Sequence, residues 1–221
     1  SMPIESPPDL MGLPMDYQKT GKFTAGTFYD LVPLLFPEHY NCDEGYRKSL
    51  ERTKTLDLLL AISENTRQDL IEHLGIAPER VVNIGSGVSH IFKEKEIQDR
   101  EVILERYGVH RDFVMYTGGS DWRKNQDGLI RAWACLPETL RKEHQLVIVC
   151  AIDEGSKKKH LQLAQSLGLR PDGVRFTGFV SDDDLVALYN LAELFKFPSL
   201  YEGFGLPIVE AMRCGTPVIG S

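Results

Sequence analysis

The chain has 221 residues, and 25 Lys and Arg against 32 Asp and Glu leave a formal net charge of −7. Hydrophobic residues make up 42% and charged residues 26%, as in a soluble globular protein, and no apolar run reaches the roughly 18 residues that span a bilayer. An acidic chain without a block of Lys or Arg is a poor binder of nucleic acid, because clustered positive charge supplies that affinity. The opening Ser1-Met2 resembles an expression remnant, and no charged-then-apolar leader follows it.

The cysteines and histidines lack the spacings of a disulfide framework or a metal site. The six histidines form no HxxxH or HExxH pair, so no metal is predicted. The cysteines are widely scattered and form no CxxC pair, which favours buried, reduced thiols in a cytoplasmic protein. These cysteines are Cys42, Cys135, Cys150 and Cys214.

The first third of the chain has mixed patterns. Residues 3–26 are rich in Pro, Gly and polar residues, which predicts irregular structure. Between residues 27 and 37, aromatic and β-branched residues precede Pro33, which predicts a short strand that runs into a loop. A helix is predicted over about residues 44–56 and a buried strand over 58–62.

The next helix has clear boundary signals. Ser63 is expected to be its N-cap, Gly75 to end it, and Pro78 to prevent its resumption. A second N-terminal signal lies further on, where Ser181 and Asp184 have the spacing of a capping box.

From Arg80 onward, apolar runs alternate regularly with helical patterns. The predicted strands are 81–84, 113–117, 146–150, 174–177, 194–197 and 218–219. The predicted helices are about 97–107, 125–136, 156–168, 182–193 and 206–214. This alternation predicts an α/β fold with right-handed βαβ units on a doubly wound parallel sheet. Such a sheet binds ligands at the carboxyl ends of its strands.

The loop after the strand 113–117 has the character of an anion site. It begins with Gly118 and Gly119, which allow close backbone approach, and it continues with the adjacent cations Arg123 and Lys124 before a helix begins. Helix N-termini attract anions, Arg binds phosphate oxygens in bidentate fashion, and Lys acts as a point charge. The alternative is a solvated turn whose cations face water.

The loop after the strand 194–197 combines glycines with carboxylates. Gly203 and Gly205 expose backbone N–H groups just before a helix, and Pro207 suits the first turn of that helix. Glu202 and Glu210 flank this start eight positions apart. The loop therefore suits a ligand with phosphates for the amides and hydroxyls for the glutamates. The alternative is a Gly-rich turn with one capping and one surface Glu.

These residues carry a family resemblance. The segment from Glu202 to Met212, followed by residues 214–219, resembles the E-x7-E signature of glycosyltransferase family 4, whose members are retaining enzymes of the GT-B fold. The stretches 60–70, 85–88, 123–125 and 176–180 resemble other segments of that family. The resemblance covers about residues 25–221 and is most specific over the last 110.

The resemblance implies a role for each matching position. Lys124 would hold the donor diphosphate and stabilise the departing nucleoside diphosphate, aided by Arg123, and Glu202 would bind hydroxyls near the anomeric carbon of the transferred sugar. Lys124 and Glu202 are the predicted catalytic residues. Glu210 would bind the ribose hydroxyls. The remaining predicted donor-site residues are Gly118, Gly119, Gly203, Phe204, Gly205, Phe179 and Val180, the last two beside the base. No obligatory metal is implied, because cations and a helix N-terminus would supply the charge stabilisation.

Three departures from the family pattern accompany this resemblance. Tyr29 and Asp30 stand where many relatives have His-Asp, so they are assigned only to the acceptor side, because Tyr is a weak base near neutral pH. Gly119 stands where many relatives have a phosphate-binding Arg, for which we expect Arg123 to compensate. The chain is also short: residues 1–95 would form a partial N-terminal domain, and 96–221 a donor-binding domain that lacks its last elements.

The sequence thus predicts part of a cytoplasmic hexosyltransferase that uses a GDP- or UDP-sugar, with mannose from GDP-mannose as one candidate. A glycan or lipid-linked acceptor, with polysaccharide biosynthesis as the setting, is compatible with peripheral membrane association of the intact enzyme. Two alternatives stay open: a non-catalytic nucleotide-sugar binding fragment, and a non-transferring GT-B relative such as a sugar-nucleotide epimerase, against which the E-x7-E segment argues.

Overall fold

The computed structural model describes residues 21–40 and 42–221, which form two compact units. The first unit holds the described residues up to Gly87 together with Glu202–Phe204, and the second holds Val88–Tyr201 and Gly205–Ser221. The domain boundary expected between residues 95 and 96 stays a prediction. Most of the irregular segment expected over residues 3–26 lies outside the described residues.

The first unit is built on a parallel sheet with the strand order β1-β2-β3. Its strands are β1 (Ala25–Phe28), β2 (Leu58–Ala61) and β3 (Val81–Asn83), and its helical elements are α1 (Val32–Leu35), α2 (Glu44–Thr53), α3 (Glu64–Leu74) and the 3₁₀ turn Pro78–Arg80. Leu59 and Leu70 are fully buried in its core, as their apolar patterns predict.

The start and end of α3 confirm the predicted signals. The Ser63 hydroxyl accepts a hydrogen bond from the Thr66 N–H at 3.0 Å, and Gly75 ends the helix in the left-handed region at φ 66°. The prediction of a loop after β1 was wrong in part. Residues 32–35 form the helical turn α1, because Pro33 lies in its first turn, where a missing N–H costs nothing, and the Asp30 carboxylate accepts from the Val32 N–H at 3.0 Å.

The second unit is the predicted doubly wound α/β fold, and its five strands are all parallel in the order β6-β5-β4-β7-β8. The strands are β4 (Asp112–Thr117), β5 (His144–Val149), β6 (Val174–Phe176), β7 (Leu194–Phe197) and β8 (Val218–Gly220). The helices are α4 (Arg100–Tyr107), α5 (Gln126–Ala134), α6 (Glu138–Glu143), α7 (Glu154–Ser166), α8 (Asp182–Leu191) and α9 (Leu206–Arg213). Of these, α6 was not predicted, because its six residues are too few to show a helical period.

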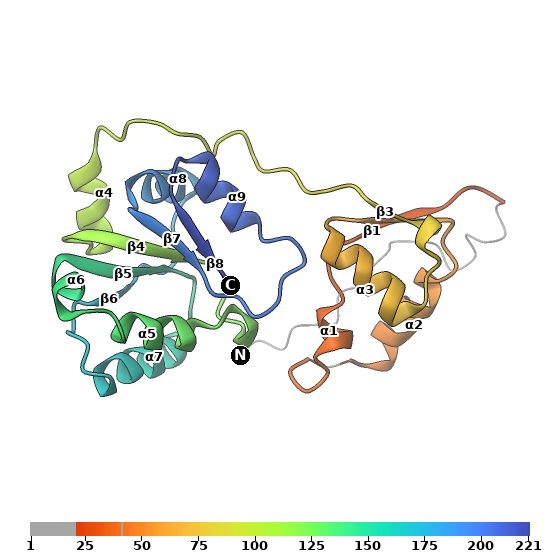
Figure 1. Ribbon diagram of the computed structural model, residues 1–221, viewed down its shortest axis with the longest axis horizontal. Coiled ribbons are helices and arrows are strands. Elements are labelled where there is room, and N and C mark those ends of the chain that lie inside the picture. The colour runs from red at the N-terminus through yellow and green to blue at the C-terminus, as the bar shows by residue number, and fades with distance from the viewer. Residues whose placement is uncertain (1–20, 41) are drawn as a thin grey trace. The chain divides into compact units, whose positions relative to one another are not determined.

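Helices cover both faces of this sheet, with α4, α8 and α9 on one side and α5 and α7 on the other (Figure 1). The side chains of β5, which lies between β6 and β4, alternate between two cores. Leu146 and Ile148 pack beneath α5 and α7, while Val147 and Val149 pack beneath α4 and α8. All four side chains are buried, which explains why the strand is a continuous apolar run in the sequence.

Two smaller predictions have mixed outcomes. Ser181 caps α8 by accepting from the Asp184 N–H at 3.2 Å, as predicted, whereas the Asp184 carboxylate binds Arg106 and Tyr107 of α4. The four cysteines are free, and Cys150 and Cys214 are buried as predicted. Cys135 is exposed, so its predicted burial was wrong: it lies two residues past the buried Trp133, on the outer side of the end of α5.

Within residues 21–40 and 42–221, no helix combines the length and the apolar composition that crossing a bilayer requires.

Candidate functional site

The loop after β4 is shaped by residues that suit unusual backbone angles. Gly118 has φ 152°, and a Cβ at this position would lie 2.6 Å from the hydroxyl of Tyr116. Residues Trp122–Lys124 form a short 3₁₀ turn that begins at Asp121, whose carboxylate accepts from the Arg123 N–H at 3.1 Å. Asn125 then adopts the left-handed region at φ 53° and leads into α5.

Two side chains fix the carbonyl of Gly119. The Tyr116 hydroxyl donates to this oxygen at 3.2 Å, and the Gln126 amide donates to it at 3.0 Å. In a trans peptide the C=O and the following N–H point in opposite directions, so the N–H of Ser120 faces away from these side chains. Tyr116 and Gln126 were not among the residues predicted from the sequence. Their burial beside a glycine turn is the signal that identifies them.

The loops after β4 and β7 meet, as the rule for parallel sheets predicts. The N–H of Leu200 donates to the carbonyl of Arg123 at 2.7 Å, and the Asn125 amide donates to the carbonyl of Pro198 at 3.1 Å. The Arg123 guanidinium adds a third link by donating to the carbonyl of Tyr201 at 3.3 Å. These hydrogen bonds hold the two loops together at the carboxyl edge of the sheet.

The side chain of Arg123 stabilises the contact between the two loops. Its side chain is only 18% exposed and forms an ion pair with Asp121 at 3.3 Å in addition to its bond to Tyr201. The guanidinium thus fastens the two loops to each other. Its expected contact with the donor phosphate stays a prediction.

Lys124 and the residue that begins α9 both lie near the ring of Phe197. Its ammonium nitrogen is 5.8 Å from the centre of the Phe197 ring, at the end of β7. A Cβ on Gly205 would lie 3.6 Å from an edge atom of the same ring. The Lys124 ammonium and the backbone that begins α9 therefore flank one buried aromatic side chain.

The N-terminus of α9 carries no side-chain cap. Gly205 is its N-cap residue at φ 89°, a backbone conformation that residues other than glycine rarely adopt. Pro207 lies in the first turn, as predicted. The first N–H groups of a helix lack intrahelical partners and bear partial positive charge. This end of α9 therefore offers N–H donors and a favourable dipole to an anion.

Glu210 lies in the second turn of α9 and binds a buried tyrosine. The Tyr189 hydroxyl donates to its Oε2 atom at 2.9 Å. Burial raises the pKa of the Glu210 carboxyl, the nearby charge of Asp182 adds to the rise, and the bond from Tyr189 opposes it. Burial and then the charge of Glu210 raise the pKa of Tyr189 in turn. Tyr189 was not among the predicted site residues, although a buried tyrosine hydroxyl usually has a polar partner.

The segment Glu202–Phe204 packs within the first unit. The Asn65 amide donates to the carbonyl of Glu202 at 3.1 Å, and the Ser63 hydroxyl donates to the carbonyl of Gly203. A Cβ on Gly203 would collide with the carbonyl oxygen of Tyr29, so this position accepts only glycine. The structure thus brings Gly203 beside Tyr29, whose side chain is 69% exposed. The predicted convergence of Glu202 with Lys124 stays a prediction.

The residues expected beside the nucleotide base lie between β6 and α8. Phe179 is 83% exposed, and Val180 packs against the core beneath α8. An aromatic side chain that remains this exposed beside a strand end can stack on a planar ligand.

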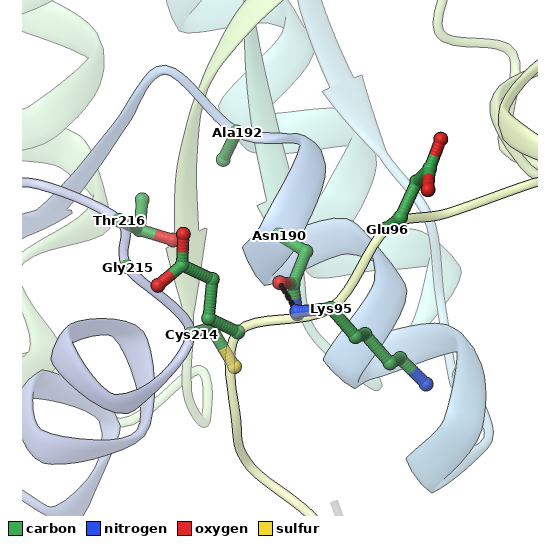
Figure 2. A pocket seen from close by; sticks show the side chains of 8 residues that line it. Lys95, Glu96, Asn190, Ala192, Cys214, Gly215 and Thr216 are labelled. Atoms are coloured by element: carbon green, nitrogen blue, oxygen red, sulfur yellow. Dashed lines mark hydrogen bonds between the residues drawn. The ribbon is translucent and has the colours of Figure 1, made fainter.

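A separate cavity of about 540 Å³ lies at the opposite edge of the sheet. Ala192 and Thr216 in its lining come just before β7 and β8, at the amino ends of these strands. Figure 2 shows the Lys95 N–H bonded to the Asn190 side chain here, at 2.8 Å. The cavity is therefore distinct from the loop that carries Lys124 and from the start of α9.

Across the part of the chain that the structure describes, no cluster of three or more His, Cys, Asp or Glu side chains is arranged to hold a metal ion. The groups described above in the second unit are instead a cation, helix N–H groups and the carboxylate of Glu210.

Comparison with known families identifies the chain. The model of the family described as "Glycosyl transferases group 1" matches residues 100–221, which is more than half of the sequence. The chain belongs to this family. The match includes both loops of the site and all of α9, and the parallel α/β architecture is that of GT-B glycosyltransferases.

Two similar curated glycosyltransferases come from Escherichia coli. The "Serotype-specific mannosyltransferase WbdA" is 39% identical over 204 residues, which cover 90% of this chain and 25% of that protein. The "O-antigen chain mannosyltransferase B" is 32% identical, with 88% and 52% covered. The chain thus spans between a quarter and about half of the length of these relatives.

Solved glycosyltransferase structures resemble the fold. Anabaena Alr3699/HepE, solved in complex with UDP and glucose, gives a TM-score of 0.72 at 26% identity, with 89% of this chain and 52% of that chain covered. The sucrose-phosphate synthase of Thermosynechococcus elongatus gives a TM-score of 0.70 at 24% identity, with 92% and 52% covered. This second likeness concerns the fold alone.

Proposed function

We propose that this chain carries the donor-binding half of a retaining glycosyltransferase that transfers a hexose from a nucleoside-diphosphate sugar to a glycan or lipid-linked acceptor. The observation that carries the proposal is the grouping of Lys124, the uncapped start of α9 and Glu210 within one unit. A cation and helix N–H groups suit a diphosphate, and a carboxylate one turn further suits sugar hydroxyls.

The roles follow from the chemistry of each group. Lys124 and the N–H groups of α9 bind the diphosphate and stabilise the charge that develops on it as the nucleoside diphosphate departs. Glu210 accepts from the ribose hydroxyls, and Phe179 with the backbone near Val180 contacts the base. Glu202 and the amides of residues 203–205 bind the transferred sugar. Tyr29 and Asp30 belong to the acceptor side.

Mannose from GDP-mannose is the donor that we favour. Two relatives that are 39% and 32% identical to this chain carry the name mannosyltransferase. Since a solved relative binds UDP and glucose, UDP-sugars are the competing donors. Cations and the α9 N-terminus supply the charge stabilisation in this proposal, which requires no metal ion.

A non-catalytic fragment that binds nucleotide sugars is the second candidate. It is favoured by the coverage of the relatives, since the chain spans 25% of WbdA and 52% of the O-antigen chain mannosyltransferase B. Both candidates require nucleotide binding, and only the first requires turnover.

Calorimetry and a turnover assay on the 221-residue chain separate these possibilities. The chain is titrated with GDP, UDP and ADP, and is then incubated with GDP-mannose and UDP-glucose labelled in the sugar. Binding together with transfer or donor hydrolysis supports the enzyme, and binding without either supports the fragment. If none of the three diphosphates binds, the proposed function is wrong.

A further inference from the structure

We propose that Tyr189 is a positioning residue that orients the Glu210 carboxylate toward the ribose of the donor. This inference rests on the proposed function, in which Glu210 accepts from the ribose hydroxyls. It assigns a role to a side chain that is fully buried and lies one helix away from the site, on α8.

The ring of Tyr189 is held from two sides. Phe92 packs edge-on against it at 5.9 Å between ring centres, and Phe195 of β7 does so at 5.4 Å. The backbone is also fixed, because the Thr216 hydroxyl donates to the Tyr189 carbonyl at 2.5 Å. The direction of the hydroxyl group is therefore set by the core rather than by the solvent.

The hydroxyl of Tyr189 points to the first turns of α9. It lies 2.9 Å from Oε2 of Glu210 and 3.4 Å from the carbonyl oxygen of Pro207. A phenol has one proton to donate, and the shorter distance and the negative charge favour the carboxylate. This bond fixes one carboxylate oxygen of Glu210.

The second oxygen of Glu210 retains its capacity to accept. Among the described residues, Oε2 receives the bond from Tyr189, and no group donates to Oε1. No cation in residues 21–40 or 42–221 forms an ion pair with Glu210 either. A neutral donor thus orients the carboxylate without neutralising it, which preserves an ionised acceptor for hydroxyl groups.

A merely structural bond would explain the same contact, since a buried phenol requires a partner. The two roles differ in their effect on ligand binding. A positioning role affects only ligands whose ribose hydroxyls reach Glu210, whereas a structural role affects stability and all ligands alike.

The test measures dissociation constants by calorimetry for GDP and for 2′,3′-dideoxy-GDP, or for the UDP pair if UDP binds more tightly. The variants are Tyr189→Phe, Glu210→Gln and Tyr107→Phe. The last is a matched control, because the Tyr107 hydroxyl donates to the Asp184 carboxylate at 2.6 Å outside the proposed site. Thermal unfolding of each variant reports on the fold.

For Tyr189→Phe we expect the ribonucleotide to bind about three- to tenfold more weakly, the equilibrium factor of one hydrogen bond, while the dideoxy ligand binds as before. Tyr107→Phe leaves the preference for the ribonucleotide unchanged. Equal losses for both ligands, or an unchanged preference in Tyr189→Phe, would overturn the positioning role while nucleotide binding stands. Failure of the wild-type chain to bind either ribonucleotide would overturn the proposed function and this inference together.

Discussion

Two buried tyrosines of the second unit each donate a hydrogen bond to a carboxylate. The first carboxylate lies near the start of α8 and the second near the start of α9. Tyr107 binds Asp184 at 2.6 Å, and Tyr189 binds Glu210 at 2.9 Å. Their surroundings differ. Arg106 also binds Asp184, at 2.7 Å, whereas no cation pairs with Glu210 among the described residues.

The two carboxyl groups respond in opposite directions. The bond from Tyr107 and then that from Arg106 lower the pKa of Asp184, although desolvation opposes them. Burial raises the pKa of Glu210. The carboxylate of Asp184 is satisfied within the fold and joins α4 to α8. Burial destabilises the charged form of Glu210. Carboxyl groups with a perturbed pKa often lie in ligand-binding sites.

Removal of a cation from the proposed site should weaken nucleotide binding more than any other change. Lys124→Ala should weaken binding of nucleoside diphosphates about ten- to a hundredfold, because a charged partner of the phosphates is lost, while the free nucleoside binds as before. Calorimetry with GDP and guanosine, or with UDP and uridine, measures both. Arg106→Ala is the control and should leave both affinities unchanged. Equal losses for diphosphate and nucleoside would make Lys124 a structural residue.

Removal of the carboxylates should separate binding from stability. Glu210→Ala should weaken nucleotide binding by about 1–3 kcal/mol, the usual cost of a lost charge-assisted hydrogen bond. Asp184→Ala should leave the nucleotide affinity within about twofold of the wild type, since it touches only α4 and α8. An unchanged dissociation constant in Glu210→Ala would contradict the ribose role.

Variants at the same two carboxylates should show the reverse order in stability. Asp184→Ala should lower the free energy of unfolding by about 1–3 kcal/mol, because it leaves the Tyr107 hydroxyl without its partner. Glu210→Gln should be neutral or slightly stabilising, because it removes a charge that burial penalises. Urea unfolding measures both. A larger loss in Glu210→Gln than in Asp184→Ala would show that Glu210 is the structural carboxylate.

A smaller effect should appear in the pH dependence. Asp184, with its lowered pKa, stabilises the fold above its unfolded pKa, and this contribution is lost as the pH falls through its folded value. The contribution of Glu210 to stability has the opposite pH dependence, because its protonation at a raised pKa removes a destabilising buried charge.

Nucleotide affinity should nevertheless fall as the pH drops through the raised pKa of Glu210. Calorimetry between about pH 7.5 and pH 5 checks this, since the range lies above the ordinary pKa of Glu. Glu210→Gln should lack the dependence, and a slope that persists in this variant would assign it to another group.

The parallel sheet and the loops at its carboxyl edge could be predicted because each depends on local signals. Apolar runs mark β4, β5 and β7, and the capping residue Ser63 and the terminating Gly75 act within a single turn. The site glycines were identified for the same reason, since Gly205 has a backbone angle that other residues rarely adopt.

The contacts between distant segments could not be predicted in this way. The bond from Tyr189 to Glu210 and the link from Arg123 to Tyr201 join positions that are 21 and 78 residues apart. Their formation depends on how α8, α9 and the two loops pack, which no local pattern records. The exposed Cys135 shows the same limit, because a residue that is usually buried was assigned from its type alone.

In the proposed site, one nucleoside diphosphate contacts Lys124 through its phosphates and Glu210 through its ribose. Calorimetric titration of the Lys124→Ala, Glu210→Ala double variant with GDP and UDP tests it most directly. We expect its loss in binding free energy to be about the sum of the two single losses, within roughly 0.5 kcal/mol, because the groups contact separate parts of the ligand. A double variant that binds both diphosphates as tightly as the wild type would contradict the account.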